Sequence, residues 1–230
     1  SREYVTEIAK RGGIIRAEGS RGCAWGRCEF CAIQYKYCNS INWRKFSNER
    51  ILNELEMLSN YGVVSPYYTD EDFVGNNFER TCELARLILK NKCSGRIRKD
   101  LNLYVDMRIA SLITNYSEAM LTELKKAGLR EIFIGIESGS KEQNKRYKKP
   151  SAINKSLKAL TLLRKLDISF DIGFIMFDPE MNIDELIENI NFIYLAQLDT
   201  HDSRMTKKLR IEPGTPILNK YIEKNLLVGK

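Results

Sequence analysis

The chain alternates short runs rich in β-branched and aromatic residues with amphipathic helical stretches. This alternation is typical of a parallel sheet built from βα units, because a parallel strand is reached only through a crossover connection. Six units rather than the eight of a closed barrel predict an α/β fold with an open, partial (β/α)6 barrel. The expected strands are residues 13–18, 63–69, 101–105, 130–136, 168–176 and 207–211.

Several helices between these strands carry their own start and stop signals. Ser47 is a candidate N-cap for a helix that ends near Tyr61 and Gly62, and a later helix should stop at Gly128. Another helix is expected at residues 183–195. No linker-like tract divides the chain, so residues 1–230 are predicted to form a single domain. Because the chain starts without methionine, we expect it to be a fragment of a longer protein.

Composition narrows the class of protein. No apolar run reaches membrane-spanning length, which predicts no membrane partner. Six cysteines at irregular spacing indicate reduced thiols rather than a disulfide framework, and therefore a cytoplasmic location. The net charge of +7 favours an anionic partner. However, the densest basic runs, at 96–99, 145–149 and 207–210, come without a nucleic-acid-binding motif and are expected to be solvated faces.

Three cysteines, Cys23, Cys28 and Cys31, follow the first expected strand within nine residues. A structural zinc site needs four cysteine or histidine ligands, and no second Cys-x-x-Cys pair follows. The single histidine, His201, leaves no basis for a histidine metal site or a catalytic triad. Three thiolates instead favour an iron–sulfur cluster whose fourth iron is open to a non-protein ligand. Cys38 is expected to be a spare thiol.

Polar side chains gather where the expected strands end. They fall at residues 70–72, 106–108, 137–140, 177–179 and 212–215. The carboxyl ends of parallel strands meet at one face of an α/β fold, and active sites are built there. The sequence therefore predicts a catalytic face on which these groups and the cysteine loop come together.

The cysteine loop, together with the runs at 68–73 and 133–139, resembles the radical S-adenosylmethionine enzymes. The resemblance extends from about residue 13 to residue 215. The usual family signature has three residues between its first two cysteines, whereas this chain has four, Ala24 to Arg27. A longer interval, with Arg-Gly before Cys23 and Phe before Cys31, is similar to the cobalamin-associated branch.

The resemblance implies a set of cofactor contacts. Cys23, Cys28 and Cys31 would hold a 4Fe-4S cluster, and the open iron would bind the amino and carboxylate groups of S-adenosylmethionine. Phe30 would contact the adenine, and Phe177 and Met176 would line its pocket. Asp70, Glu71 and Asp72 would contact the methionyl ammonium. Arg108 would contact the methionyl carboxylate, and Glu137 with Ser138 would contact the ribose.

The resemblance also implies an activity. The enzyme would cleave S-adenosylmethionine reductively to a 5′-deoxyadenosyl radical and modify, for example methylate, an unactivated carbon of a peptide or metabolite. An electron donor such as flavodoxin or ferredoxin is implied, and cobalamin enters by analogy with the branch. An RNA-modifying relative of the methylthiotransferase type is an alternative, which the basic charge favours. A non-enzymatic iron–sulfur electron carrier is another, with Cys38 as its nearest fourth ligand.

Overall fold

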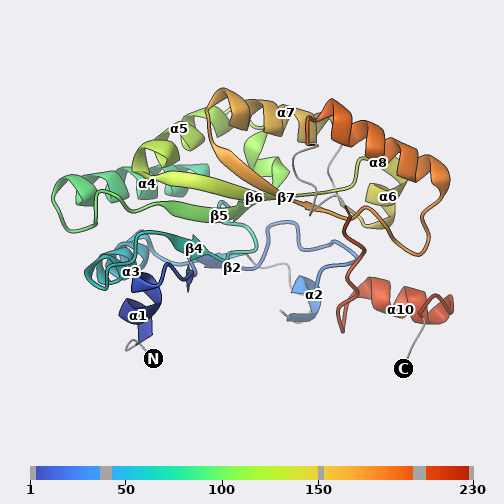
Figure 1. The fold of residues 1–230 in the computed structure, drawn as a ribbon, viewed down its shortest axis with the longest axis horizontal. Coiled ribbons are helices and arrows are strands. Elements are labelled where there is room, and N and C mark those ends of the chain that lie inside the picture. The colour runs from blue at the N-terminus through green and yellow to red at the C-terminus, as the bar shows by residue number, and fades with distance from the viewer. Residues whose placement is uncertain (1–3, 37–42, 150–152, 199–205, 228–230) are drawn as a thin grey trace.

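The computed structural model describes residues 4–36, 43–149, 153–198 and 206–227 (Figure 1). Cys38 and His201 lie outside these residues, so the expectations for both stay predictions. Its main sheet has five parallel strands in the order β1-β4-β5-β6-β7. The strands are β1 (Ile15–Ala17), β4 (Pro66–Tyr68), β5 (Leu103–Met107), β6 (Leu129–Glu137) and β7 (Ser169–Phe174).

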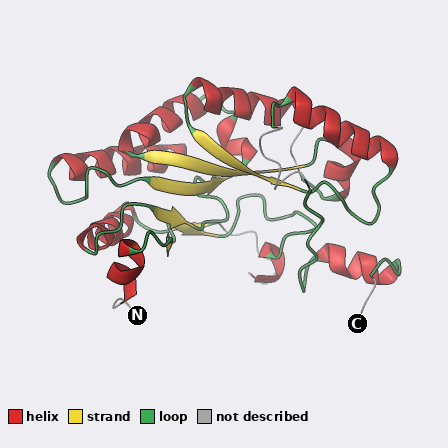
Figure 2. Ribbon diagram, in the orientation of Figure 1, coloured by secondary structure: helices red, strands yellow, loops and turns green. Residues whose placement is uncertain are grey.

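Helices cover the outside of this sheet, and Figure 2 shows the α4, α5, α7 and α8 helices along one side of the strands. Two short strands, β2 (Ser20–Arg21) and β3 (Arg44–Lys45), pair separately as an antiparallel ribbon. The α-helices are α1 (Val5–Lys10), α2 (Ile33–Lys36), α3 (Asn48–Asn60), α4 (Phe78–Cys93), α5 (Ser117–Ala127), α6 (Lys141–Arg146), α7 (Ile153–Lys165), α8 (Ile183–Leu195) and α10 (Pro216–Glu223). The α/β fold with an open, partial barrel is confirmed.

The expected sixth strand, residues 207–211, differs from the structure. Lys208 forms one isolated parallel bridge with Phe177, and the described residues after it run on without a strand. Lys207, Lys208 and Arg210 are exposed, whereas Leu209 and Ile211 pack, partly buried, against a small second cluster that includes Tyr147 and Tyr221 and lies outside the main core. Pro213 and Gly214 then turn the chain into α10. The sheet therefore ends at β7.

The helix boundaries confirm the expected stop and start signals. The Ser47 hydroxyl accepts a hydrogen bond from the Arg50 amide and caps α3. Gly128 ends α5 with φ +110°, and a Cβ there would lie 2.5 Å from the Leu101 carbonyl oxygen. Glycine is needed at this position for both reasons. No described helix is long and apolar enough to cross a membrane.

Alternate residues of the strands face two different environments. Val105, Ile132, Ile134 and Ile172 are fully buried against the helices and form the main hydrophobic core. Their neighbours along the strands, such as Asp106 and Phe133, are half-buried on the concave side. The period of two along each strand thus separates the core from the interior of the open barrel. Polar groups on the concave side are therefore available to form a functional site.

Candidate active site

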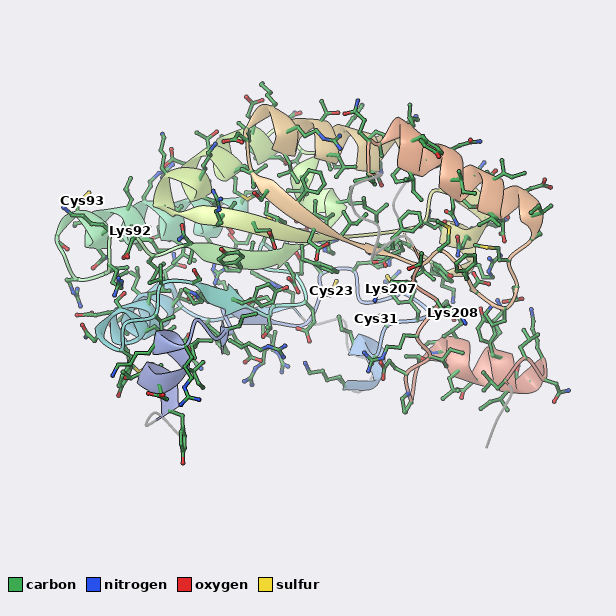
Figure 3. All side chains as sticks on the ribbon, viewed as in Figure 1. Cys23, Cys31, Lys92, Cys93, Lys207 and Lys208 are labelled. Atoms are coloured by element: carbon green, nitrogen blue, oxygen red, sulfur yellow. The ribbon has the colours of Figure 1, made fainter. Side chains whose placement is uncertain are left out.

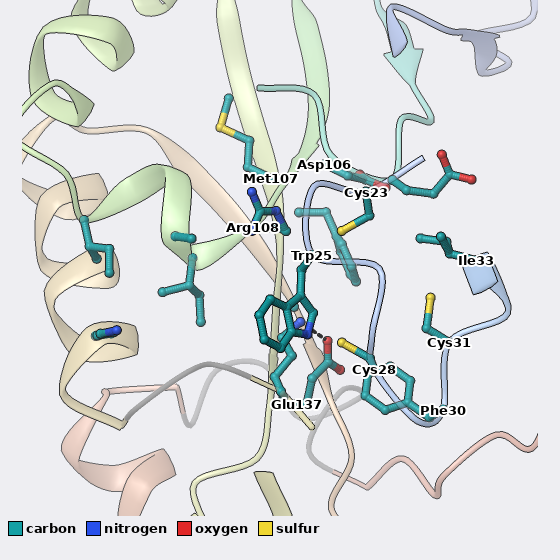
Figure 4. Close-up of a pocket in the computed structure, with 18 residues that line it drawn as sticks. Cys23, Trp25, Cys28, Phe30, Cys31, Ile33, Asp106, Met107, Arg108 and Glu137 are labelled. Atoms are coloured by element: carbon teal, nitrogen blue, oxygen red, sulfur yellow. Dashed lines mark hydrogen bonds and ion pairs between the residues drawn. The ribbon is translucent and has the colours of Figure 1, made fainter. Parts of the chain in front are cut away.

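A cavity of about 420 Å³ lies at the carboxyl ends of the strands (Figure 4). The cysteine loop forms one wall, and the ends of β5 and β6 form the opposite one. Seven of the twelve site residues expected from the sequence line it: Cys23, Cys28, Phe30, Cys31, Glu71, Arg108 and Glu137. The structure does not place Asp70, Asp72, Ser138, Met176 and Phe177 in its lining, and Met176 is buried in the main core instead.

The cysteine loop is held by contacts with segments far away in the chain. The Gly22 amide donates to Glu71 Oε2 at 2.8 Å, and the Ala24 amide donates to Asp72 Oδ2 at 3.3 Å. Further along, the Glu29 amide donates to the Tyr147 carbonyl at 2.9 Å. These bonds fix both ends of a loop that has little regular structure of its own. All three cysteines are free thiols that line the same cavity.

The thiols suit a cluster better than a single ion. Among the described residues, no three cysteine, histidine, aspartate or glutamate side chains are close enough to hold one metal ion. A cubane cluster has a different requirement, because each thiolate ligates its own iron. Burial raises the pKa of Cys28 to about 12, against the opposing charge of Lys149, and burial also raises the pKa of Cys31. Iron must therefore displace the thiol protons on binding.

The three adjacent acids at the end of β4 have three different environments. Asp70 is fully buried and accepts bonds from the Gly19 amide, at 3.0 Å, and from the Ser20 hydroxyl. Asp72 is also fully buried and pairs with Arg108. Only Glu71 lines the cavity. This agrees with the alternation of side chains at a strand end and leaves Glu71 as the candidate for the methionyl ammonium.

The Glu71 carboxylate is kept in its charged form, in which it can accept hydrogen bonds. Burial raises its pKa, but the Lys36 ammonium, 2.7 Å from Oε1, and the Gly22 amide more than offset this, so its pKa lies below the ordinary value. We expect Glu71→Gln to weaken binding of S-adenosylmethionine at least tenfold, since a hydrogen bond to a charged group contributes about 1.5–3 kcal/mol. Equilibrium binding to the cluster-loaded protein measures this.

A matched control for Glu71 is Glu118→Gln. Glu118 is also a carboxylate paired with a lysine, Lys165, but it lies on α5 outside the cavity. The control should bind S-adenosylmethionine as the unchanged protein does. Equal affinities for the Glu71 and Glu118 variants would contradict the role of Glu71.

Asp70 gives the protein a specific dependence of stability on pH. Burial, only partly offset by its hydrogen bonds, raises its pKa from 3.8 to about 6. A carboxyl with a raised folded-state pKa stabilises the fold fully below pH 3.8, and this contribution is lost as pH rises through 6. The quantity to follow is the difference in free energy of unfolding between the unchanged protein and Asp70→Asn. We expect this difference to fall by about 2–3 kcal/mol between pH 4 and pH 7. Urea unfolding of the cluster-free, reduced protein measures it.

Asp100→Asn provides the contrast for that pH series. The exposed Asp100 carboxyl bonds to Arg98, which holds its pKa below the ordinary value. Its contribution is present above the unfolded pKa and is lost as pH falls, so the difference should have the opposite sign. A difference for Asp70→Asn that stays constant over the same pH range would contradict the role given to burial.

Glu137 ends β6 in an unusual backbone conformation. It has φ +70°, and the register with β7 shifts between Gly135 and Glu137. Its carboxylate pairs with Lys149 at 3.0 Å, and both side chains are nearly buried in the cavity wall. A Cβ at Gly135 would lie 2.3 Å from Glu137 Oε1 and 2.9 Å from Lys149 Nζ. The glycine therefore makes the space that the ion pair occupies.

Lys149 is a functional candidate that the sequence did not reveal, because it ends a basic run expected to be solvated. Burial lowers its pKa, yet the neighbouring Glu137 carboxylate and the Cys28 thiol group raise it overall. Its ammonium is thus a fixed positive charge beside the cysteine loop. No signal in the sequence separates Lys149 from the other basic residues of the run at 145–149.

Ser138 and Phe177 lie away from the position expected for them. The buried Ser138 hydroxyl donates to Gln143 Oε1 at 2.6 Å and belongs to a polar network with Asn189. Phe177 is 40% exposed and pairs with Lys208. The neighbouring Gly139 lies against α8, where a Cβ would be 2.2 Å from Phe192 Cβ.

Apolar groups complete the cavity. Phe30, which the sequence predicted there, packs edge-on against the buried Tyr147 ring, with centroids 5.4 Å apart. Asp106, at a strand end predicted to lie on this face, accepts a hydrogen bond from the Tyr67 hydroxyl, and burial raises its pKa to about 6. The lining residues that the sequence missed include Trp25, Ile33, Met107, Ile109, Ala110, Ile113 and Phe133, with Lys155. Side chains of this kind exclude water from a reactive centre.

Two proteins that carry names are similar to this chain in sequence over most of its length. The 4′-phospho-dehydrooxetanocin synthase of Priestia megaterium is 35% identical over 209 residues, which cover 84% of this chain and 27% of that protein. The hopanoid C-3 methylase of Methylococcus capsulatus is 29% identical over 163 residues, covering 71% of this chain and 28% of the relative. The chain thus spans less than a third of the length of these relatives.

A solved structure shows the same fold. It is the cobalamin-dependent S-adenosylmethionine radical enzyme OxsB, with aqua-cobalamin and S-adenosylmethionine bound, and it superposes with a TM-score of 0.73 at 28% sequence identity. The match covers 97% of this chain and 32% of OxsB. The model of the family described as the radical SAM superfamily matches residues 18–193, which include all three loop cysteines and every strand from β4 to β7. This chain belongs to the radical SAM superfamily.

Proposed function

We propose that this chain is the catalytic core of a cobalamin-associated radical SAM enzyme that modifies, for example methylates, an unactivated carbon of a peptide or metabolite. One observation carries the proposal: three free thiols, a charged acceptor and a buried ion pair line the same largely apolar cavity. The likeness to a methylase and to a cobalamin-dependent enzyme supports the branch. Membership of an enzyme family argues against the non-enzymatic electron carrier.

Cys23, Cys28 and Cys31 would hold the 4Fe-4S cluster, and this fits the donor set because three thiols face the cavity from one loop. When bound, the cluster supplies the electron that breaks the bond between sulfur and the 5′-carbon of S-adenosylmethionine. The protein residues bind and orient the cofactor and exclude water. They perform no redox step themselves.

Charged groups on either side of the cysteines match the two ends of a methionyl group. Glu71 offers a carboxylate to the ammonium, and Lys149 offers an ammonium to the carboxylate. Arg108 also lines the cavity, but its guanidinium is held by Asp72 and by Asn76, at 2.7 Å. We assign the carboxylate to Lys149 because its charge lies beside Cys28 and Cys23, where the cofactor would be held, with Arg108 positioning the loop through Asp72. Phe30 offers a ring face to the adenine.

Anaerobic reconstitution with iron and sulfide tests the proposal. We expect about four irons per chain, brown absorbance, and 5′-deoxyadenosine on addition of dithionite and S-adenosylmethionine, detected by chromatography. A fully loaded protein that forms no 5′-deoxyadenosine would contradict it. Cobalamin, peptides or RNA are then added to the same reaction. The addition that consumes the radical distinguishes the cobalamin-associated branch from the RNA-modifying alternative.

A further inference from the structure

One carboxylate of the cavity takes no part in the cofactor contacts proposed above. Asp106 lies at the end of β5, on the wall that faces the cysteine loop (Figure 4). The charged groups already considered at the cavity belong to three ion pairs: Glu71 with Lys36, Arg108 with Asp72, and Glu137 with Lys149. Within the ranges that the structure describes, Asp106 is in no ion pair. Its negative charge is therefore left for a ligand.

The Asp106 carboxylate has one oxygen occupied and one open. The Tyr67 hydroxyl donates to Oδ1 and holds the carboxylate in place. Both side chains are half-buried. No described residue donates a hydrogen bond to Oδ2. Because removing a carboxylate oxygen from water without a partner is costly, we expect Oδ2 to meet a donor that a ligand supplies.

The electrostatic surroundings of Asp106 are negative. Burial raises its pKa to about 6, the Tyr67 hydrogen bond opposes this, and the Asp70 and Glu71 carboxylates raise the pKa further. No described cation lowers it, although Lys155 of α7 also lines the cavity. At neutral pH the carboxylate is mostly ionised and lacks a counter-charge. A cationic donor is therefore favoured over a neutral hydroxyl or amide.

Apolar side chains adjoin Asp106 on the same wall. Phe133 is its neighbour in the register of β5 with β6, and adjacent strands lie about 4.8 Å apart, so the ring and the carboxylate share the concave side. An aromatic ring beside a carboxylate suits an ammonium group, which the face of the ring also attracts. After Asp106 in the chain, Ile109, Ala110 and Ile113 line the cavity. The wall thus combines one anionic acceptor with hydrocarbon.

We propose that Asp106 binds the ammonium group of an organic amine, so that the substrate of this enzyme is an amine with an apolar body; the inference rests on the proposed function. The ammonium donates to Oδ2 while Tyr67 holds Oδ1, and the body of the amine lies against Phe133 and the apolar residues after β5. Recognition of this kind forms and breaks no covalent bond. It places the carbon skeleton of the amine between Asp106 and the cysteine loop, where the cofactor would be held.

The methionyl ammonium of S-adenosylmethionine is the other cation that Asp106 could bind. Glu71 is joined to the cysteine loop through the Gly22 amide, at 2.8 Å, whereas no hydrogen bond between described residues joins the Asp106 side chain to that loop. Glu71 is therefore fixed to the loop that carries the three thiols, and Asp106 belongs to the opposite wall. This difference favours Glu71 for the cofactor and Asp106 for the substrate.

Three small probes of similar size test the charge that Asp106 prefers. They are 2-phenylethylamine, 2-phenylethanol and phenylacetate, which are cationic, neutral and anionic at neutral pH. Titration calorimetry measures their binding to the cluster-loaded protein with S-adenosylmethionine present and no reductant, so that Glu71 is occupied and nothing is cleaved. The same titrations are made with Asp106→Asn. Asp167→Asn is the matched control, because the Asp167 side chain is 99% exposed, pairs with Lys125 and lies outside the cavity.

We expect the unchanged protein to bind 2-phenylethylamine at least about tenfold more tightly than 2-phenylethanol, and phenylacetate more weakly than either. Asp106→Asn should lose this preference, because its amide still accepts the Tyr67 hydrogen bond but carries no charge. Its affinity for the amine should fall at least about tenfold, and its affinity for the alcohol less than about threefold. Asp167→Asn should bind all three probes as the unchanged protein does.

Equal affinities of the unchanged protein for the amine and the alcohol would overturn the proposal, and this comparison depends on no variant. A preference for the amine that Asp106→Asn retains would overturn it as well. If Asp106→Asn weakened S-adenosylmethionine binding as Glu71→Gln does and left amine binding intact, Asp106 would belong to the cofactor site instead. Loaded protein that forms no 5′-deoxyadenosine with dithionite would count against the proposed function, whereas the preference for the amine, which needs no reduction, would still decide the role of Asp106.

Discussion

Replacing Cys23, Cys28 or Cys31 with alanine, one at a time, should abolish both the brown absorbance of the reconstituted protein and all cleavage of S-adenosylmethionine. Each thiol lines the cavity. Among the described residues, no histidine or carboxylate lies close enough to two of these thiols to complete a three-ligand metal site. Two thiolates hold a 4Fe-4S cluster poorly. Iron analysis, visible absorbance and chromatography of 5′-deoxyadenosine measure the loss.

Cys82→Ala and Cys93→Ala are the matched controls. Cys82 packs against the hydrophobic core, and Figure 3 shows Cys93 at the far end of the molecule from Cys31. Both variants should retain full iron content and activity. A Cys23 variant that keeps its cluster would refute the ligand assignment.

Lys149→Met should have two separable effects. It leaves the Glu137 carboxylate nearly buried without its cation, which costs about 3–5 kcal/mol of folding stability. It also removes the charge assigned to the methionyl carboxylate, so the affinity for S-adenosylmethionine should fall at least tenfold, or about 1.4 kcal/mol. Urea unfolding and equilibrium binding measure these effects separately.

The double variant Glu137→Gln with Lys149→Met separates structure from function. It has no unpaired buried charge, so its stability should return most of the way to that of the unchanged protein. Its affinity for S-adenosylmethionine should remain low. A double variant that binds and cleaves the cofactor normally would show that the ion pair serves only to hold the end of β6.

The fold could be predicted where local signals and burial agree. Ser47 begins α3 and Gly128 ends α5 because side-chain capping and positive φ are local requirements that the residue type reveals. The segment 207–211 was predicted as the strand of a sixth βα unit, and this prediction was wrong. Strand formation depends on pairing with a neighbouring strand, which a single segment does not specify, and here Lys208 forms one isolated bridge with Phe177.

The candidate site was predictable where the spacing of residues along the chain identifies the ligands. The three cysteines lie close in the chain, so their convergence needed no knowledge of tertiary structure. Asp106 lies at a strand end that the sequence placed on the catalytic face, whereas Lys149 reaches the same cavity from the turn after α6 and has no signal that distinguishes it from a solvated charge. Asp70 and Ser138 show the opposite case, since polar residues at strand ends can satisfy the backbone of neighbouring loops instead of facing the site.

The order of the strands across the sheet is also their order along the chain. Each strand can therefore add to an edge that already exists as the polypeptide leaves the ribosome, with no strand inserted between two earlier ones. The cysteine loop follows β1 and is made before β4, β5, β6 and β7. Glu137 and Lys149, on the far wall, follow only after β6. We therefore expect the three thiols to be open to solvent, to oxidants and to iron donors during synthesis until more than half of the sheet is in place.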